Sequence, residues 1–163
     1  MAENLDSTDW AILGELQRDG RIAFTELARR VNLSASATTE RVRRLEAAGV
    51  ITGYRAQVHL ERTGYAVLAV VRLKYPGNRH EPLRRLLRER PEILECLRTT
   101  GDDCYVLKVA ATSMAHLEEI VDVLAEFGST TTNLVLSRTL PARGPQEPRA
   151  NCSDRAVNDR EGT

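Results

Sequence analysis

The sequence predicts an α+β protein, with an N-terminal three-helix helix-turn-helix domain followed by a ferredoxin-like βαββαβ domain. Two observations support this fold class. Three short apolar patterns at helical spacing fill residues 1–50, and the last two are joined by a tight Asn-Leu-Ser turn. From residue 65 onward, four strand patterns and two helical patterns follow in the order strand, helix, strand, strand, helix, strand.

The first helix is expected to begin after Asp6, whose side chain suits an N-cap. Gly20 marks its end. The second helix is expected over residues 24–31, and Asn32 suits the turn after it because asparagine tolerates a positive φ. Ser34 then caps a third helix that is expected to run to Ala48, with Gly49 as its stop signal.

The third helix combines a thin apolar face with small and basic residues elsewhere. Small side chains at its start let the backbone approach a groove closely, and the arginines behind them can reach phosphates. A charge cluster alone is more often a solvated helix face, but the helix-turn-helix context favours a DNA contact. The candidate DNA-binding residues are Ser34, Ser36, Ala37, Thr39, Glu40, Arg41, Arg43 and Arg44.

Residues 51–64 are expected to form an extended linker strand. The second domain, residues 65–140, then contains expected strands at 65–74, 93–100, 105–111 and 131–140. Pro82 suits the start of one helix, and Ser113 caps the other. An open sheet of this kind leaves one face uncovered, and a second subunit commonly covers it. Residues 141–163 have no apolar period and are expected to be disordered.

Composition narrows the class of protein. The chain has 163 residues and no formal net charge, so local charge rather than the total must decide any contact with nucleic acid. No apolar run approaches the roughly 20 residues of a membrane span, and no signal segment is apparent, which predicts a cytoplasmic protein. The three cysteines lack metal-ligand spacing, so reduced thiols and no bound metal are expected.

The pattern resembles the Lrp/AsnC (leucine-responsive, feast/famine) family of transcription regulators. The matching stretches are residues 5–13, 20–21, 26–28, 33–34, 41–51, 100–108 and 128–132. The resemblance implies a winged or plain helix-turn-helix, a regulatory domain that binds an amino acid, and dimers that assemble into larger, often octameric, particles. It also implies double-stranded DNA as the macromolecular partner and no cofactor beyond the amino-acid effector.

Three positions depart from the family pattern. Ala23 stands where a serine or threonine cap is usual, and Thr38 fills an inward position that is often aliphatic. The loop that commonly reads Gly-Asp-Tyr-Asp-Tyr is here Gly-Asp-Asp-Cys-Tyr at residues 101–105, which moves the second acid by one place.

The loop at residues 100–105 has two interpretations. It is a plain turn between antiparallel strands, or its amides receive a carboxylate while an aspartate pairs with an ammonium group. Spacing alone favours the turn, whereas the family resemblance favours the site. The candidate effector-binding residues are Thr100, Gly101, Asp102, Asp103, Cys104, Tyr105, Thr130 and Thr132.

A sequence-specific, effector-modulated transcription regulator is therefore the leading hypothesis. One alternative is an effector-independent architectural protein that compacts DNA. Another is an enzyme like the sirohaem decarboxylases, which need paired histidines, whereas His59, His80 and His116 lie in separate segments. The sequence contains no phosphate-binding glycine loop and no recognisable nucleophile–base pattern, so no enzymatic activity is predicted.

Overall fold

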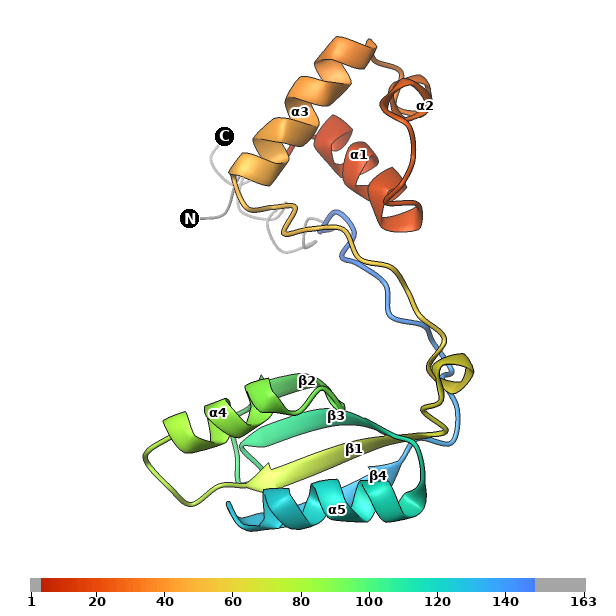
Figure 1. Ribbon diagram of the computed structural model, residues 1–163. Helices are drawn as coiled ribbons and strands as arrows, with labels where there is room; N and C mark the ends of the chain where they lie inside the picture. Colours follow the sequence, from red (N-terminus) through yellow and green to blue (C-terminus); the bar gives the residue numbers. More distant parts are fainter. Residues whose placement is uncertain (1–3, 149–163) are drawn as a thin grey trace, which may run out of the picture. The chain divides into compact units, whose positions relative to one another are not determined.

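The computed structural model describes residues 4–148, which divide into two compact units. One unit contains the chain up to Ala56 together with the segment that begins at Pro141, and the other is Gln57–Leu140. The chain passes from the first unit to the second between residues 56 and 57, within the stretch that was expected to be a linker. Each unit is described separately (Figure 1).

The first unit contains α1 (Ser7–Arg18), α2 (Phe24–Arg30) and α3 (Ala35–Ala47). Asp6 caps α1 through a reciprocal capping box with Asp9, and the Ser34 side chain accepts from the amide of Ala37 at 3.2 Å. Asn32 lies in the left-handed region at φ 56°, so the sharp turn predicted before α3 is confirmed. The start of α2 has no side-chain cap because alanine stands at that position.

Apolar residues from all three helices form one small core. Its fully enclosed members come from the inner faces of the helices, and they are Ile12, Leu13, Leu27, Val42 and Leu45. Thr38 is also completely buried, and its hydroxyl donates to the backbone oxygen of Ser34 at 3.0 Å. The polar group at this usually aliphatic position is therefore satisfied within its own helix.

The linker differs from the expected strand. Residues 51–59 make no sheet ladder, and a single turn of 3₁₀ helix follows at Leu60–Thr63. No strand of the described residues pairs with residues 51–59, so this segment lacks the backbone ladder that defines a sheet. The prediction of an extended linker strand over residues 51–64 is therefore wrong.

The second unit is a four-stranded antiparallel sheet with strand order β2-β3-β1-β4. The strands are β1 (Val67–Lys74), β2 (Ile93–Arg98), β3 (Tyr105–Ala111) and β4 (Ser129–Leu134), and the helices are α4 (Glu81–Glu89) and α5 (Met114–Ala125). This is the predicted βαββαβ order. Both helices contribute to one apolar core with β1 and β3, so they cover the same face of the sheet.

The last strand is shorter than predicted. β4 pairs with β1 from Lys74↔Ser129 to Ala69↔Leu134, and the amide of Val135 still donates to Leu68 O. Because β1 begins at Val67, the chain beyond residue 135 has no strand to follow. The expected strand over residues 131–140 is therefore wrong in its second half.

The chain after Leu140 belongs to the first unit. Residues 141–148 form no helix or strand, but Gln17 on α1 donates to Pro145 O at 3.1 Å. The predicted disordered tail thus begins with a segment that is placed against α1. The rest of that prediction, for residues 149–163, lies outside the described residues.

Candidate functional site

The outward face of α3 carries the row of polar side chains that was expected to contact DNA. Ser36, Glu40 and Arg43 are exposed and recur at positions that share one side of the helix. Ala37 and Thr39 are half-buried beside them, and the Thr39 hydroxyl donates to its own helix at Ala35 O, 2.8 Å away. Ser34 serves as the N-cap, so its side chain is already engaged at the start of α3.

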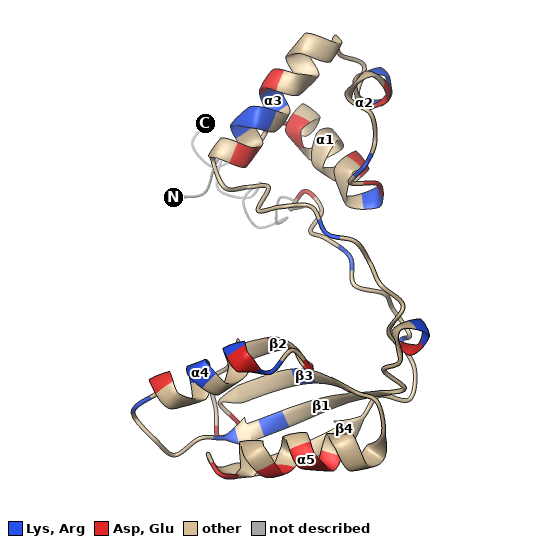
Figure 2. Cartoon of the chain, in the orientation of Figure 1, with Lys and Arg blue, Asp and Glu red and all other residues tan. Residues whose placement is uncertain are grey.

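Two of the residues that were expected to contact DNA, Arg41 and Arg44, have carboxylate partners on the protein. Arg41 Nη1 lies 2.8 Å from both Asp6 Oδ2 and Asp9 Oδ1, and Arg44 Nη2 lies 2.7 Å from Asp9 Oδ2. Figure 2 shows these basic turns of α3 beside acidic residues of α1. The Asp9 side chain is 1% exposed, so this contact joins the two helices at a buried carboxylate. Arg41 and Arg44 are therefore already paired on the protein, and the DNA contact expected of all three arginines of α3 stays a prediction.

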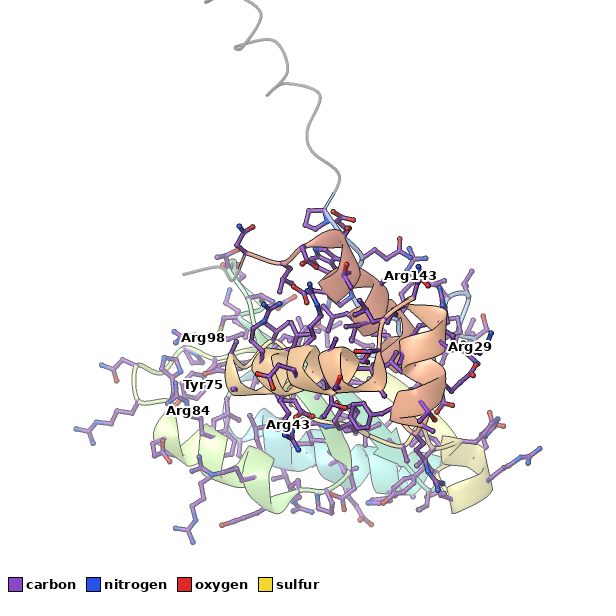
Figure 3. All side chains as sticks on the ribbon, turned by 90° about the horizontal axis from the view of Figure 1, so that it is seen from above. Arg29, Arg43, Tyr75, Arg84, Arg98 and Arg143 are labelled. Atoms are coloured by element: carbon purple, nitrogen blue, oxygen red, sulfur yellow. The ribbon has the colours of Figure 1, made fainter. Side chains whose placement is uncertain are left out.

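Arg43 differs from its neighbours. Its side chain is exposed on α3 and is labelled in Figure 3. Among residues 4–148 it forms none of the ion pairs that hold the other arginines of this helix. A guanidinium that lacks a carboxylate partner keeps its full positive charge available to a ligand. On a helix-turn-helix surface the expected ligand is a phosphate.

The basic residues of α2 are also neutralised locally. Glu26 accepts from Arg29 Nη2 at 2.8 Å and from Arg30 Nε at 2.8 Å, and Arg30 also reaches Glu15 on α1. Hydrogen bonds from Arg29 and then Arg30 lower the pKa of Glu26 to about 2. The helix that precedes the recognition helix therefore presents charge pairs rather than free cations.

The predicted effector loop closes the β2–β3 hairpin. Thr99 N donates to Cys104 O at 2.9 Å, and the Thr99 hydroxyl donates to Asp103 O at 2.8 Å. Gly101 has φ 97°, which favours glycine, and a Cβ there would meet no atom within 4 Å. The loop is thus an ordered turn with open space at its tip.

Two basic side chains of β1 lie against the loop. Arg72 Nε is 3.7 Å from Asp103 Oδ2, and Lys74 Nζ is 3.1 Å from Asp102 Oδ2. Sequence reasoning missed both because it assigned residues 65–74 to one buried strand. Their alternation with fully buried Val71 and Leu73 was the available signal, since alternate residues of a strand face opposite sides.

The other expected effector residues are distributed differently. Thr130 and Thr132 pair with Leu73 and Val71, so they share the helix-covered side, whereas Thr131 pairs with Arg72 on the open side. The Tyr105 side chain is 4% exposed. Its hydroxyl is 2.8 Å from His80 Nδ1, so it belongs to the core. The Cys104 thiol turns toward the end of β1, where it lies 3.7 Å from Tyr75 O.

His80 and His116 of the second unit have separate partners. His80 contacts Tyr105 and Arg98, and its pKa is lowered by burial and then by the nearby arginine. His116 contacts Thr112. Within residues 4–148 no group of His, Cys, Asp or Glu is arranged to hold a metal ion. No helix in that range is long and apolar enough to cross a membrane.

Both units match described families. Residues 5–52 match the winged helix-turn-helix DNA-binding family, and residues 68–145 match the Lrp/AsnC ligand binding domain. The transcriptional regulator LrpC of Bacillus subtilis is 32% identical over 82% of this chain and 92% of its own length. A leucine-responsive regulatory protein of Rhizobium meliloti is 36% identical over 83% of this chain and 87% of its own.

Solved structures agree with these sequence matches. The structure of Bacillus subtilis LrpC superposes with a TM-score of 0.82 at 31% identity, covering 86% of this chain and all of that one. A Neisseria meningitidis transcriptional regulator in complex with L-Met superposes with a TM-score of 0.79 at 30% identity, covering 85% and 94%. With both domains matched in order, this chain belongs to the Lrp/AsnC family of DNA-binding transcription regulators.

Proposed function

We propose that this protein is a sequence-specific regulator that reads double-stranded DNA with α3 and responds to a free amino acid. The observation that carries the DNA-binding part is the exposed row Ser36, Glu40 and Arg43, which follows the capped start of α3. In this proposal Ser36, Thr39 and Glu40 contact base edges, and Arg43 contacts a phosphate. Such a regulator works where the chromosome is, in the cytoplasm, and carries out no catalytic step.

The amino-acid part rests on the charges around the β2–β3 loop. A free amino acid presents a carboxylate and an ammonium group a few ångströms apart. Arg72 and Asp103 offer the complementary pair, and the open tip at Gly101 leaves room beside them. The Neisseria meningitidis relative that was solved with L-Met supports an amino acid as the ligand class.

The uncovered face of the sheet supports a homodimer. Leu97 is 53% exposed on β2, and its register partner Val106 lies on the side opposite the helices. Burial of such a face against a second copy would remove apolar surface from water and would bring two recognition helices to paired half-sites. Larger assemblies, such as octamers, follow from the family resemblance.

Selection from random duplexes tests the DNA-binding part. The protein is expected to enrich one sequence pattern with two related half-sites, and Glu40→Gln is expected to change the preferred base at one position of each half-site. Enrichment of no pattern at moderate salt would favour the architectural alternative, because such proteins bind with little sequence preference.

A thermal-shift screen of the twenty amino acids tests the effector. A ligand present at 100 times its Kd stabilises the folded protein by roughly 2.7 kcal/mol, which is readily measured as a higher Tm. The expected result is that one or a few amino acids raise the Tm. No response to any of them would contradict the proposed effector class.

A further inference from the structure

The ion pairs between α1 and α3 are built around one buried carboxylate. Both oxygens of Asp9 are used, since Oδ1 accepts from Arg41 and Oδ2 from Arg44. The Asp9 side chain is 1% exposed, whereas those of Arg41 and Arg44 are 28% and 53% exposed. The anion is therefore fixed inside the domain while the two cations lie at its surface.

Asp6 completes the arrangement at the start of α1. Its Oδ1 caps the helix by accepting from Asp9 N at 2.8 Å, and its Oδ2 accepts from Arg41 at 2.8 Å. The hydrogen bond from the Asp9 amide and then that from Arg41 lower the pKa of the Asp6 carboxyl. The capping box therefore holds both carboxylates in place for the α3 arginines, and Asp6 and Asp9 are together called the acidic clamp.

Helix capping by itself does not require a basic partner. An N-cap needs only an acceptor for a backbone amide, and asparagine or serine provides one as well as aspartate does. Here both residues of the capping box are acidic, and their carboxylate oxygens also accept from Arg41 and Arg44 of α3. Among residues 4–148 the structure leaves Arg43 as the arginine of α3 that no carboxylate holds.

We propose that the acidic clamp determines DNA specificity by holding Arg41 and Arg44 on the protein and away from phosphates. This inference rests on the proposed DNA reading by α3 and adds a role for α1. Each lysine or arginine that contacts a phosphate strengthens binding to every sequence equally, because the gain comes from counterion release. If Arg41 and Arg44 do not contact phosphates, the affinity for non-specific DNA is lower, whereas the contacts of α3 with base edges are unchanged. The ratio of specific to non-specific affinity is therefore higher.

The position of the clamp makes it an effective competitor for these side chains. Asp9 is shielded from water, and its bonds to the guanidinium groups are charge-assisted and short. A phosphate on the outside competes from water, where ionic attraction is weaker. If the clamp is discharged, the exposed heads of Arg41 and Arg44 become free to reach the DNA backbone.

Asp9→Asn is the direct test, because it keeps an acceptor oxygen and removes the charge. With two arginines released, the plot of log Kobs against log salt concentration for a non-specific duplex should steepen by up to about 1.8 units, at about 0.9 per phosphate contact. Over a fourfold range of salt this is about a tenfold larger change in affinity. At low salt the non-specific affinity should rise, and the specific-to-non-specific ratio should fall. A brace that only supports the fold would give the opposite sign, with weaker binding to all DNA.

Arginine variants provide matched controls within the same helix. Arg43→Ala should flatten the salt slope by about 0.9 units, whereas Arg44→Ala and Arg41→Ala should change it by less than half as much. In the double variant Asp9→Asn with Arg44→Ala, the salt slope should be less steep than in Asp9→Asn alone, because one of the two released arginines is absent. Circular dichroism and melting curves establish that each variant is folded.

Several results would overturn the clamp. One is a folded Asp9→Asn protein whose slope is unchanged or flatter. Another is an Arg44→Ala slope that falls as much as that of Arg43→Ala, since Arg44 would then already contact DNA. The comparison of the salt slopes of Arg43→Ala and Arg44→Ala tests the proposal even if Asp9→Asn fails to fold. If the unsubstituted protein bound no duplex, the proposed function would be contradicted, and so would the role of the acidic clamp that rests on it. This outcome differs from the other two, in which the protein binds DNA.

Discussion

The two aspartates of the β2–β3 loop should contribute unequally to effector binding, and Asp103 should contribute more. Its side chain is 39% exposed beside Arg72, whereas that of Asp102 is 87% exposed beside Lys74. Loss of a charge-assisted hydrogen bond to a bound ammonium group costs about 1.5–3 kcal/mol, so Asp103→Asn should raise the Kd roughly tenfold to a hundredfold. A contact at the almost fully exposed Asp102 is screened by water, so Asp102→Asn should raise the Kd less than about fivefold.

Isothermal titration calorimetry with the best amino acid from the thermal screen measures this difference. Asp122→Asn, on the exposed side of α5, removes a charge from the same domain without touching the loop and is the matched control. The reasoning is refuted if Asp102→Asn weakens binding more than Asp103→Asn. It is also refuted if both loop variants bind as tightly as the control, because the loop would then be only a turn.

Three further predictions concern acid stability, assembly and folding of the recognition helix. Because the pKa of Glu26 is lowered from 4.5 to about 2, its stabilising effect is present above pH 4.5 and is lost as the pH falls toward 2. Urea titrations of Glu26→Gln should therefore show a smaller loss of stability in that window than the parent does. Leu97→Glu should shift sedimentation from dimer toward monomer at micromolar concentration, and an unchanged dimer would exclude the sheet face as the interface. Thr38→Val should raise the Tm by removing a buried hydroxyl whose acceptor, Ser34 O, also receives the Thr38 amide, and a lower Tm would show that the hydroxyl is needed.

Features that depend on neighbouring residues were predictable from the sequence. Ser34 caps α3, and Asn32 adopts a positive φ, because each preference is a property of a single side chain and the backbone beside it. The strand and helix order of the second domain followed in the same way from apolar periodicity. The end of the last strand did not, because its length is set by where β1 begins, at Val67.

The arrangement of the candidate sites was not predictable from the sequence, because it depends on contacts between residues that are far apart in the chain. An acid in the first turn of a helix is favoured by the helix dipole, so Asp9 has an ordinary local role. Nothing in the neighbouring residues indicates that its carboxylate is buried against arginines 32 and 35 positions away. Arg72 meets Asp103 only because β1 lies next to β3 in the strand order. Strand order and helix packing determine which charged side chains come into contact. Neither can be read from the pattern of residue types along the sequence.

The return of the chain to α1 has a consequence for the order of folding during synthesis. Residues 141–148 are made about 85 positions after the end of the three-helix segment at Ala56, which corresponds to roughly 5–15 s at ordinary rates of translation. Small helical domains with local contacts fold in microseconds to milliseconds. The three helices therefore have time to pack on the ribosome before the segment that contacts Gln17 is made. We expect that segment to join a domain that is already folded, once the chain through Leu140 has been synthesised.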